Sequence, residues 1–491
     1  MTEDVLIVGA GPVGLTLACL LRQAGLRPLV LEALAAPDGV TKVGSIGPHA
    51  VEVLARCGVH GDLVAAEQEN LRGYARMTGG SAVPGGKQVR GEHFAGAPGI
   101  DVSHHTTDRH RRMLVEQPIL VSILLKRAAQ LGFSPRWQHE VVEAGQDGSE
   151  AFVIARTPAG PRRITARYVI GADGPRSAVR GLAGFPFEGT GPTLTARQAL
   201  VELDPDGAVP PPGFHAMEGG MLAYGTAIDS LGTFEFDGPP TTSEPLTAAE
   251  LQASVDRVRG PGVRIRSIRE GSRYTDVARQ AATYRSGRIL LVGDSAHVHP
   301  PIGAQGLTLG LGDAANLAAK LTARLLGRLP DGILDTYTGE RHPVAARLLA
   351  MIRAQVALMR PDSHNRALRR MFLRLMELPQ VNDHLARFAG AFDLRYDVGG
   401  DDPLLGTFRS GLDTSVATRD GSVPLATLLG GRRGVLVGFP GARPLPGAVA
   451  AAEPWADVTA ALLRPDGCVV WLSRTADAHG LAAAGRRWLG R

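Results

Sequence analysis

Three short stretches of this chain combine glycines with a carboxylate, a pattern suited to an anionic ligand that carries hydroxyl groups. The first, Gly9 to Gly14, has the form GxGxxG and lies between the apolar run Val5–Val8 and a segment of helical periodicity. Glycines at such a turn let the backbone approach a pyrophosphate, and the amino end of the following helix favours negative charge. Glu32 follows eighteen residues after Gly14, where a carboxylate can accept hydrogen bonds from a ribose. The stretch therefore predicts a nucleotide site, although a plain glycine turn before a helix has the same pattern.

The other two stretches each place an aspartate where a predicted strand ends. Asp173 belongs to the GADG that follows Thr165–Ile170, and Asp294 follows the buried run Ile289–Val292. After Asp294, the segment Pro300–Gly306 is too rich in Pro and Gly for regular structure, and apolar residues then recur at helical spacing. An acidic residue at a strand end, followed by a Gly-rich loop that leads into a helix, suits the same kind of ligand. For both aspartates, a simple turn cap is the alternative.

In this order and spacing, the motifs resemble those of the flavoprotein aromatic hydroxylases of the para-hydroxybenzoate hydroxylase fold, the single-component group A monooxygenases. That family has an N-terminal GxGxxG, a central Asp-Gly and a Gly-Asp near residue 300, which here are Gly9–Gly14, Asp173-Gly174 and Gly293-Asp294. Residues 275–297 and 464–471 further resemble the actinobacterial hydroxylases of aromatic polyketides. The resemblance covers the whole chain. It implies FAD as the cofactor and NADPH or NADH as a transient reductant.

The resemblance also implies the fold, which is a mixed α/β architecture. We expect a Rossmann-like FAD-binding domain, an inserted β-sheet substrate domain and a C-terminal thioredoxin-like domain. The distribution of glycine, proline and helical periodicity along the chain assigns residues 1–75, 101–182 and 283–398 to the FAD-binding domain. It assigns residues 76–100 and 183–282 to the substrate domain, and residues 399–491 to the C-terminal domain. Apolar spacing predicts helices at Val13–Ala24, Val51–Arg56, Ile119–Ala129, Ala248–Val258, Leu334–Met359 and Val458–Leu463.

Cofactor-binding roles follow from the same resemblance. The residues concerned are Gly9, Gly11, Pro12, Val13, Gly14, Glu32, Ala33, Lys42, Gln117, Val141, Asp173, Gly293, Asp294, Pro301, Gly303, Ala304, Gln305, Gly306, Leu307 and Thr308. Glu32 would hold the adenosine ribose and Asp294 a ribityl hydroxyl, while amides near Leu307 would face the N1/O2 edge of the isoalloxazine. For Lys42 and Gln117, exposed polar residues are the alternative interpretation.

The loop between Gly303 and Thr308 departs from the family pattern at two positions. Relatives commonly have GGQGxN there, whereas this chain has Ala304 at the second position and Thr308 at the last. The departures bear on the position of the flavin and on the type of reaction.

The substrate is expected between the β-rich layer and the flavin. Candidate wall residues are Met217, Met221, Leu222, Tyr224, Phe234 and Phe236, although alternating apolar residues also suit plain sheet core. The resemblance implies NAD(P)H-dependent hydroxylation of a polycyclic aromatic, polyketide-type substrate by O2 through a flavin C4a-hydroperoxide. The sequence identifies no catalytic residue. The alternatives are a Baeyer–Villiger or ring-cleaving oxygenase on the same fold, and a non-catalytic flavin-bound protein that holds an intermediate.

Composition argues against several other classes of protein. The chain has 491 residues, a net charge of +5 and only 5% aromatic residues, with no basic run interleaved with aromatics, so nucleic-acid binding is not expected. The densest basic cluster, formed by Arg109, Arg111 and Arg112, is expected to be solvated. No apolar run reaches membrane-spanning length and no secretory signal is apparent. These features predict a cytoplasmic protein without a membrane partner.

Cysteine and histidine spacing indicates neither disulfides nor metal. Cys19, Cys57 and Cys468 form no CxxC, so the C-terminal domain is expected to be structural rather than redox-active. The cluster His104, His105 and His110 does not share one helix face, and no metal site is predicted. A homodimer is an arrangement that the sequence leaves open.

Overall fold

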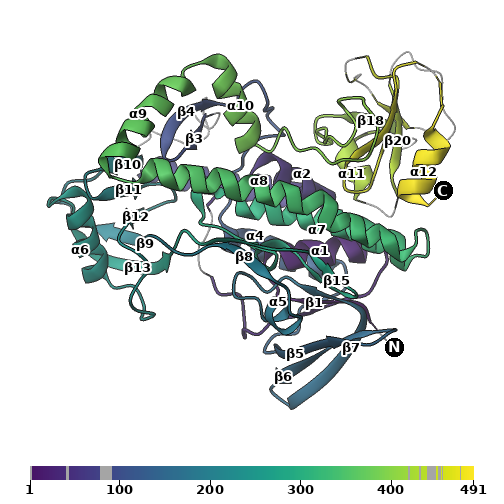
Figure 1. Cartoon of the computed structure of the whole chain (residues 1–491), viewed down its shortest axis with the longest axis horizontal. Helices are drawn as coiled ribbons and strands as arrows, with labels where there is room; N and C mark the ends of the chain where they lie inside the picture. Colours follow the sequence, from purple (N-terminus) through teal and green to yellow (C-terminus); the bar gives the residue numbers. More distant parts are fainter. Residues whose placement is uncertain are drawn as a thin grey trace.

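The computed structural model describes residues 3–39, 44–77, 91–418, 421–430, 433–439, 449–451, 455, 457–475 and 477–490. Two long helices, α7 (Gly306–Leu325) and α8 (Asp335–Met359), cross the middle of the molecule (Figure 1). A five-stranded sheet lies at one side of them and the C-terminal unit at the other, and a further sheet lies below them in this view. The mixed α/β class predicted from the sequence is confirmed.

The central sheet brings the three glycine motifs to one edge. Its strands lie in the order β15 (Arg285–Ser286), β16 (Ile289–Leu291), β7 (Gly160–Gly171), β1 (Glu3–Val8) and β2 (Pro28–Leu31), and the hairpin of β5 (Glu140–Gln146) and β6 (Ala151–Thr157) joins through β7. The neighbours β16, β7, β1 and β2 are parallel. Their carboxyl ends lead directly into Gly293, Asp173, Gly9 and Glu32. Parallel strands end at the same edge of a sheet, which places the carboxylates together.

The helices of this part of the chain pack on the sheet or on one another. They are α1 (Pro12–Gln23), α2 (Pro48–Arg56), α3 (His60–Met77), α4 (Gln117–Gln130), α7 (Gly306–Leu325) and α8 (Asp335–Met359). Prolines stand at the first turn of α1, α2 and α4, where a missing backbone N–H costs nothing. The helices predicted in these places are confirmed to within two residues at most ends, and α3 is one that the sequence analysis missed.

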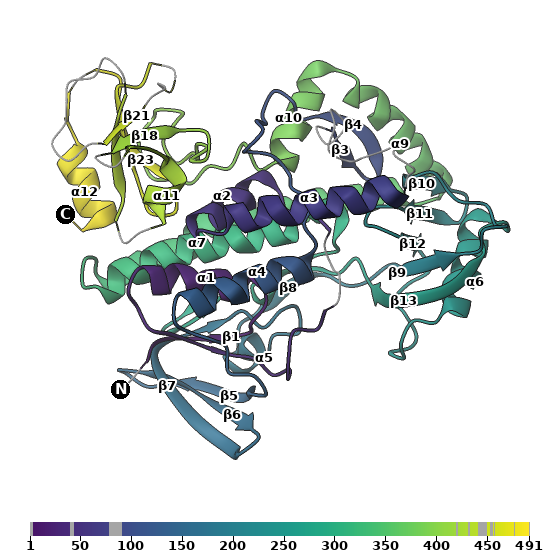
Figure 2. The same cartoon turned by 180° about the vertical axis from the view of Figure 1, so that it is seen from behind.

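The second sheet is antiparallel and is covered on both faces. Its strands lie in the order β10 (Gly213–Met217), β11 (Gly220–Tyr224), β12 (Ser230–Glu235), β9 (Thr195–Leu203) and β13 (Ile265–Tyr274). One face carries α6 (Ala248–Arg259). The other meets the hairpin of β3 (Gly91–Phe94) and β4 (Ala97–Asp101), since a Cβ on Gly96 would lie 2.7 Å from Phe214 and 2.9 Å from Met221. Helices α9 (Ser363–Met376) and α10 (Pro379–Ala389) pack on that hairpin (Figure 2).

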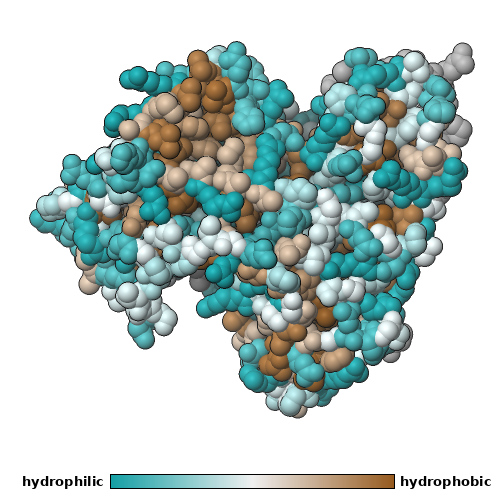
Figure 3. Space-filling view, in the orientation of Figure 1, coloured by the Kyte–Doolittle hydropathy of each residue, from teal (hydrophilic) through white to brown (hydrophobic). Residues whose placement is uncertain are grey.

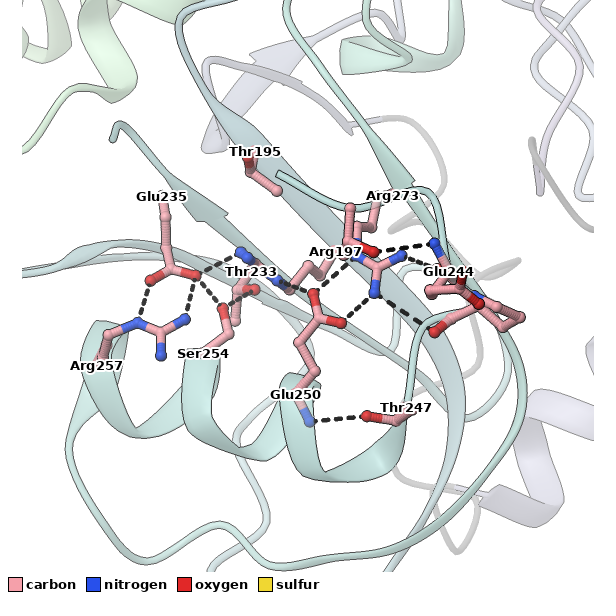
Figure 4. Close-up of polar contacts among 12 residues, drawn as sticks. Thr195, Arg197, Thr233, Glu235, Glu244, Thr247, Glu250, Ser254, Arg257 and Arg273 are labelled. Carbon is pink, nitrogen blue, oxygen red and sulfur yellow. Dashed lines mark hydrogen bonds and ion pairs between the residues drawn. The ribbon is translucent and has the colours of Figure 1, made fainter. Parts of the chain in front are cut away.

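A layer of ion pairs fixes α6 to its face of the sheet (Figure 4). Glu235 of β12 accepts from Arg257 Nε at 2.6 Å and from Arg197 Nη1 at 2.5 Å. Glu250 of α6 accepts from Arg197 Nε at 2.8 Å and from Arg273 Nε at 2.8 Å. Three guanidinium groups and two carboxylates therefore satisfy one another between helix and sheet, and this charged cluster is part of the packing.

In its described residues, the C-terminal unit forms a six-stranded sheet with two short helices. The strands, in chain order, are β18 (Ser415–Thr418), β19 (Gly421–Pro424), β20 (Val435–Gly438), β21 (Val449–Ala451), β22 (Ala460–Leu463) and β23 (Val469–Ser473), and the helices are α11 (Leu425–Leu429) and α12 (Leu481–Leu489). The helix predicted at Val458–Leu463 is wrong, because Ala460–Leu463 forms β22 between β20 and β23. Four consecutive buried apolar residues suit a central strand as well as a helix.

A buried ion cluster joins the C-terminal unit to the two long helices. Arg464, in the turn after β22, donates to both oxygens of Glu340 on α8 at 2.8 Å and to Asp466 at 2.5 Å. Lys320 of α7 lies 2.9 Å from Glu340. Burial would raise the pKa of Glu340, but Arg464 and Lys320 lower it to about 2. The turn at Arg464 is therefore a fixed support for α7 and α8.

The ion-pair layer under α6 predicts a specific loss of acid stability. Hydrogen bonds from Arg273 and then Arg197 lower the pKa of Glu250 to about 2. Its stabilising effect is full above the unfolded value of about 4.3 and is lost as the pH falls towards 2. We expect Glu250→Gln to lower Tm at pH 7 by roughly 2–4 °C and to leave Tm at pH 2 close to that of the parent protein. Circular dichroism melts measure both.

The matched control is Glu218→Gln, at an exposed position in the β10–β11 turn of the same sheet. It should leave Tm unchanged at both pH values. An equal loss in both variants, or a loss from Glu250→Gln that persists at pH 2, would contradict the role given to the Glu250 pairs.

Candidate functional site

The glycine turn after β1 has the close packing and the open face that a pyrophosphate site needs. Gly9 has φ 110°, and a Cβ there would lie 2.3 Å from the carbonyl oxygen of Ala172, while one on Gly14 would lie 2.1 Å from that of Gly9. In contrast, a Cβ on Gly11 would have no atom within 4 Å. Gly11 precedes Pro12, the first residue of α1, and no side chain caps this helix. The turn thus presents open space and free amides at a helix amino end.

Glu32 ties the end of β2 to the same turn. Its Oε2 accepts from the Ala10 amide at 2.8 Å and its Oε1 from the Leu34 amide at 3.0 Å. The His139 amide donates to the Glu32 carbonyl at 2.8 Å, so the chain that leads into Val141 runs beside Glu32. Val141 itself is buried in β5, and Ala33 is exposed. The carboxylate has lone pairs left for a ribose, at the place where the resemblance puts the adenosine.

Asp173 links the second motif to the third. Its Oδ1 accepts from Ser177 Oγ at 2.5 Å and from Ser295 Oγ at 3.0 Å, and its Oδ2 accepts from the Val179 amide at 3.1 Å. Asp173 therefore supports the start of α5 (Ala178–Leu182) and also holds the turn of η2 (Gly293–Ser295). Asp294, in the middle of that turn, is exposed. Asp173 thus connects two parts of the protein, whereas the side chain of Asp294 is exposed at the surface of the turn.

A buried carboxylate, Asp313 on α7, also binds the third motif, Gly293-Asp294. Its Oδ2 accepts from the Gly293 amide at 3.1 Å and lies 2.7 Å from His297 Nε2, and its Oδ1 accepts from Arg341 Nε at 2.6 Å. Arg341 also donates to the Leu309 carbonyl at 2.9 Å. Asp313, His297 and Arg341 are at most 1% exposed. Burial would raise the pKa of Asp313, but Arg341 and His297 lower it below its ordinary value.

The backbones of Gly293 and Gly310 and the side chain of Val13 also approach closely beside this cluster. A Cβ on Gly293 would lie 3.2 Å from Val13, and one on Gly310 would lie 2.8 Å from Val13 and 3.2 Å from the Cα of Gly293. The starts of α1 and α7 and the turn after β16 are thus held together at Val13. The predicted residues of the first and third motifs are brought into one cradle.

The loop that follows begins α7 with strained backbone. Gly303 in η3 (Ile302–Ala304) has φ 76°, and Ala304 has φ 52°. A left-handed alanine costs roughly 1–2 kcal/mol, so glycine would relax this position. Gln305 precedes α7 without a capping hydrogen bond, and its Oε1 is buried without a hydrogen-bond partner. The first amides of α7, at Gly306, Leu307 and Thr308, therefore have no side-chain cap.

Thr308 faces the start of α2 rather than the loop. A Cβ on Gly47 would lie 2.6 Å from its Oγ1. Ile46 pairs with Met113, which brings the chain before Gln117 alongside the start of α2. Gln117 is the first residue of α4 and is half-buried. Lys42 lies outside the described residues. Pro301 is exposed at the entry to the loop.

The six candidate wall residues divide between the two faces of the antiparallel sheet. Met221, Phe234 and Phe236 pack with the main core on the hairpin side, whereas Met217, Leu222 and Tyr224 pack under α6. Side chains alternate along a strand, so neighbours in sequence face opposite ways. The last three are structural core beneath the ion-pair layer and do not face the cradle. Half-buried Phe214 and Tyr274, which the sequence analysis missed, join the hairpin-side group.

A cavity of about 300 Å³ lies behind the loop, between the first turn of α7, α8 and the end of α10. Gln305, Thr308, Leu348 and Phe388 are among its lining residues. None of the six candidate wall residues lines it.

Of the basic cluster expected to be solvated, Arg109 is exposed, whereas Arg111 and Arg112 are ion-paired. Arg111 donates to both oxygens of Glu67, at 2.7 and 2.6 Å, and Arg112 Nε donates to Glu92 of β3 at 2.6 Å. Arg112 also reaches Ser45 Oγ at 3.1 Å, which fixes the hairpin beside the segment that follows Lys42. Sequence spacing shows the arginines but not their distant partners.

In the part of the chain that the structure describes, no group of three His, Cys, Asp or Glu side chains could hold a metal ion. Within the same described ranges, no helix is long and apolar enough to cross a membrane. All three cysteines are buried and free.

Comparison with known families covers nearly the whole chain. The FAD binding domain family matches residues 2–351, and the family of aromatic-ring hydroxylase C-terminal domains matches residues 402–491. The open glycine turn, the exposed Asp294 and the uncapped start of α7 fit the pyrophosphate, ribityl and isoalloxazine parts of FAD.

Individual relatives align over their full length. The chain is 36% identical over 521 positions to the 12-dehydrotetracycline 5-monooxygenase/anhydrotetracycline 6-monooxygenase of Streptomyces rimosus, covering 100% of this chain and 99% of that protein. It is 34% identical over 505 positions to the dialkyldecalin synthase of Streptomyces rugosporus, covering 100% and 99%. The solved structure of the OxyS anhydrotetracycline hydroxylase from Streptomyces rimosus has a TM-score of 0.85 at 35% identity, with both chains covered completely.

The cluster at Asp313 predicts a defect in flavin binding that is separable from general instability. Asp313→Asn keeps the size of the side chain but leaves Arg341 without its buried partner, which typically costs about 3–5 kcal/mol. Because the Gly293 turn and the start of α7 lose their common anchor, we expect the Kd for FAD to rise by at least roughly tenfold. Fluorescence titration of the apoprotein with FAD measures it.

The matched control is Glu235→Gln, which breaks a buried arginine pair on the α6 face. It should lower Tm while changing the Kd for FAD by less than about twofold. If Asp313→Asn does not fold, His297→Gln removes one contact of the same carboxylate and tests the same point. Equal Kd values in all variants would contradict the anchoring role.

Proposed function

The chain belongs to the FAD-binding aromatic-ring hydroxylases, and we propose that it uses FAD and O2 to hydroxylate a polycyclic aromatic substrate of polyketide type. The family and the monooxygenase class predicted from the sequence are confirmed. The observation that carries the proposal is the convergence of Gly11, Glu32 and Asp294 at one edge of the central sheet, next to the uncapped start of α7. The substrate class rests on the anhydrotetracycline 6-monooxygenase relative, 99% of which is covered.

We assign the parts of FAD to residues of this cradle. The amides after Gly11 would hold the pyrophosphate, and Glu32 the adenosine ribose. Asp294 would accept from a ribityl hydroxyl. The amides of Leu307 and Thr308 would face the N1/O2 edge, where helix amino ends stabilise developing negative charge. Bound FAD would supply the activation of O2 after reduction by NADPH or NADH.

The substrate is proposed to lie between this loop and the hairpin face of the antiparallel sheet. Helix η3 contacts β3, and the hairpin in turn lies against Phe214 and Met221. The half-buried rings of Phe214, Phe236 and Tyr274 offer flat apolar surface to a fused aromatic system. Contact between loop and hairpin would also exclude water from the reacting ring.

The proposed activity has a direct test. Purified protein should carry FAD, oxidise NADPH or NADH faster when a phenolic polycyclic polyketide is added, and transfer one atom of ¹⁸O₂ to the product. Oxygen-electrode traces and mass spectrometry measure these outcomes. A Baeyer–Villiger or ring-cleaving oxygenase would also add one oxygen atom, so the mass of the product does not separate it from a hydroxylase. NMR separates them, because a hydroxylase gives a new hydroxyl and the alternative gives an ester. Substrate conversion or tight product binding without NAD(P)H consumption would contradict the proposal and favour a non-oxidative role.

Two aromatic substitutions on opposite faces of the sheet serve as matched controls. Phe236→Leu, on the hairpin side, should raise KM for the polycycle by roughly tenfold, since about 1.4 kcal/mol corresponds to tenfold. Tyr224→Phe, beneath α6, should leave KM unchanged. Equal effects of the two changes would argue that the substrate does not bind on the hairpin face.

A further inference from the structure

Helix α9 carries a line of exposed apolar side chains. Leu368 is 44% exposed, Met371 54% and Leu375 40%, and Leu378 just beyond the helix is 49% exposed. The spacing places the three helical residues on one side of α9, and together with Leu378 we term them the α9 stripe. They account for four of the ten exposed large apolar side chains among the described residues. Figure 3 shows the brown patch over this helix at the upper left.

The packed side of α9 is a different surface of the helix. Phe372 stacks on Phe94 of the hairpin with ring centroids 5.0 Å apart, and Met376 is only 4% exposed. Arg369 donates to the Ala95 carbonyl at 2.7 Å. The helix is therefore already fixed to the molecule, and the α9 stripe is a second apolar surface that this packing does not use.

A row of arginines runs beside the stripe. Arg366, Arg370 and Arg374 are exposed and spaced by four residues, which puts them in line along α9. No acidic residue occurs between Ser363 and Met376. The exposed side of α9 thus combines an apolar line with a positive edge, the pattern of helices that lie in the interface of an anionic bilayer.

We propose that α9 docks this protein reversibly on an anionic lipid surface. The α9 stripe would enter the boundary between headgroups and acyl chains, and the three arginines would pair with lipid phosphates. The helix lies at the outer rim of the molecule in both ribbon views, so a flat surface can reach it (Figures 1 and 2). A second copy of this chain suits the surface less well, because antiparallel α9 helices would bring two arginine rows together.

This mode differs from membrane spanning, and it revises the sequence-based expectation of no membrane partner. It also suits the chemistry of the site, because α9 covers the hairpin that lies over Met221 and Phe214. A large apolar aromatic substrate partitions into lipid, and docking at α9 would bring the proposed substrate face near that source.

Vesicle flotation of the full-length, FAD-loaded protein tests the proposal. The protein should float with vesicles of equal phosphatidylglycerol and phosphatidylcholine, but not with phosphatidylcholine alone. Binding should fall by at least roughly tenfold in 0.5 M NaCl, because salt screens the arginine contribution. The triple variants Leu368→Gln/Met371→Gln/Leu375→Gln and Arg366→Gln/Arg370→Gln/Arg374→Gln should each lose at least about tenfold in affinity.

The control is Val209→Gln, which removes an apolar side chain that is 58% exposed in the loop between β9 and β10. It should bind vesicles as the parent protein does, and all variants should keep their FAD content and Tm. The proposal is overturned if the parent protein does not float with anionic vesicles, or if Val209→Gln weakens binding equally. Sedimentation showing a dimer that only the stripe variants lose, without vesicle binding, would instead assign the stripe to a second copy. These outcomes do not depend on monooxygenase activity, which is measured separately.

Discussion

The buried carboxylate of Asp313 is the constraint on which the proposed flavin cradle depends. It receives the Gly293 amide and His297 from the stretch after β16 and Arg341 from α8, so that with its own helix α7 it joins three segments of the chain. In a buried site a charge must be compensated by hydrogen bonds of good geometry, so the three segments are held to one arrangement. The turn that exposes Asp294 and the first turn of α7 acquire their relative position from this one group. FAD would then bind to a surface that is already organised.

A second ion cluster extends this support to the far end of the chain. Arg341 donates to Tyr396 at 2.9 Å, and the preceding residue of α8, Glu340, pairs with Arg464 in the C-terminal unit. Cys468 lies in the turn that leads into β23. It is buried and free, and it is not part of a CxxC motif. The C-terminal unit therefore contributes to the site by fixing α7 and α8, at a distance from the expected chemistry.

The sequence predicted the parts of the site that depend on local backbone geometry. Gly9, Gly14 and Gly293 stand where a Cβ would meet another backbone or Val13, and such positions leave a pattern in the sequence. Parallel strands then bring Glu32, Asp173 and Asp294 to one edge. The family resemblance added the cofactor, and the comparisons confirm that family.

Other parts depend on contacts between distant segments and were missed or wrong. Asp313 is the one acidic residue of α7, a signal that the sequence analysis missed, and its partner Arg341 lies 28 residues away. Met221 and Leu222 lie on opposite faces of one strand, and apolar character alone did not show which face meets the cradle. The run Ala460–Leu463 suits a helix or a strand equally well, so its apolar residues did not decide between them. Ala304 was recognised as a departure, but its left-handed conformation, φ 52°, is visible only in the fold.

The most direct test of the account is an experimental structure of the protein with FAD bound. The account predicts the pyrophosphate at the turn of Gly11, the Glu32 carboxylate within hydrogen-bond distance of the ribose, and Asp294 within that distance of a ribityl hydroxyl. It also predicts the isoalloxazine beside the loop from Pro301 to Thr308, with the Asp313–Arg341 pair intact. FAD bound elsewhere, or bound with Asp294 turned away and the Gly293 turn released from Asp313, would contradict it.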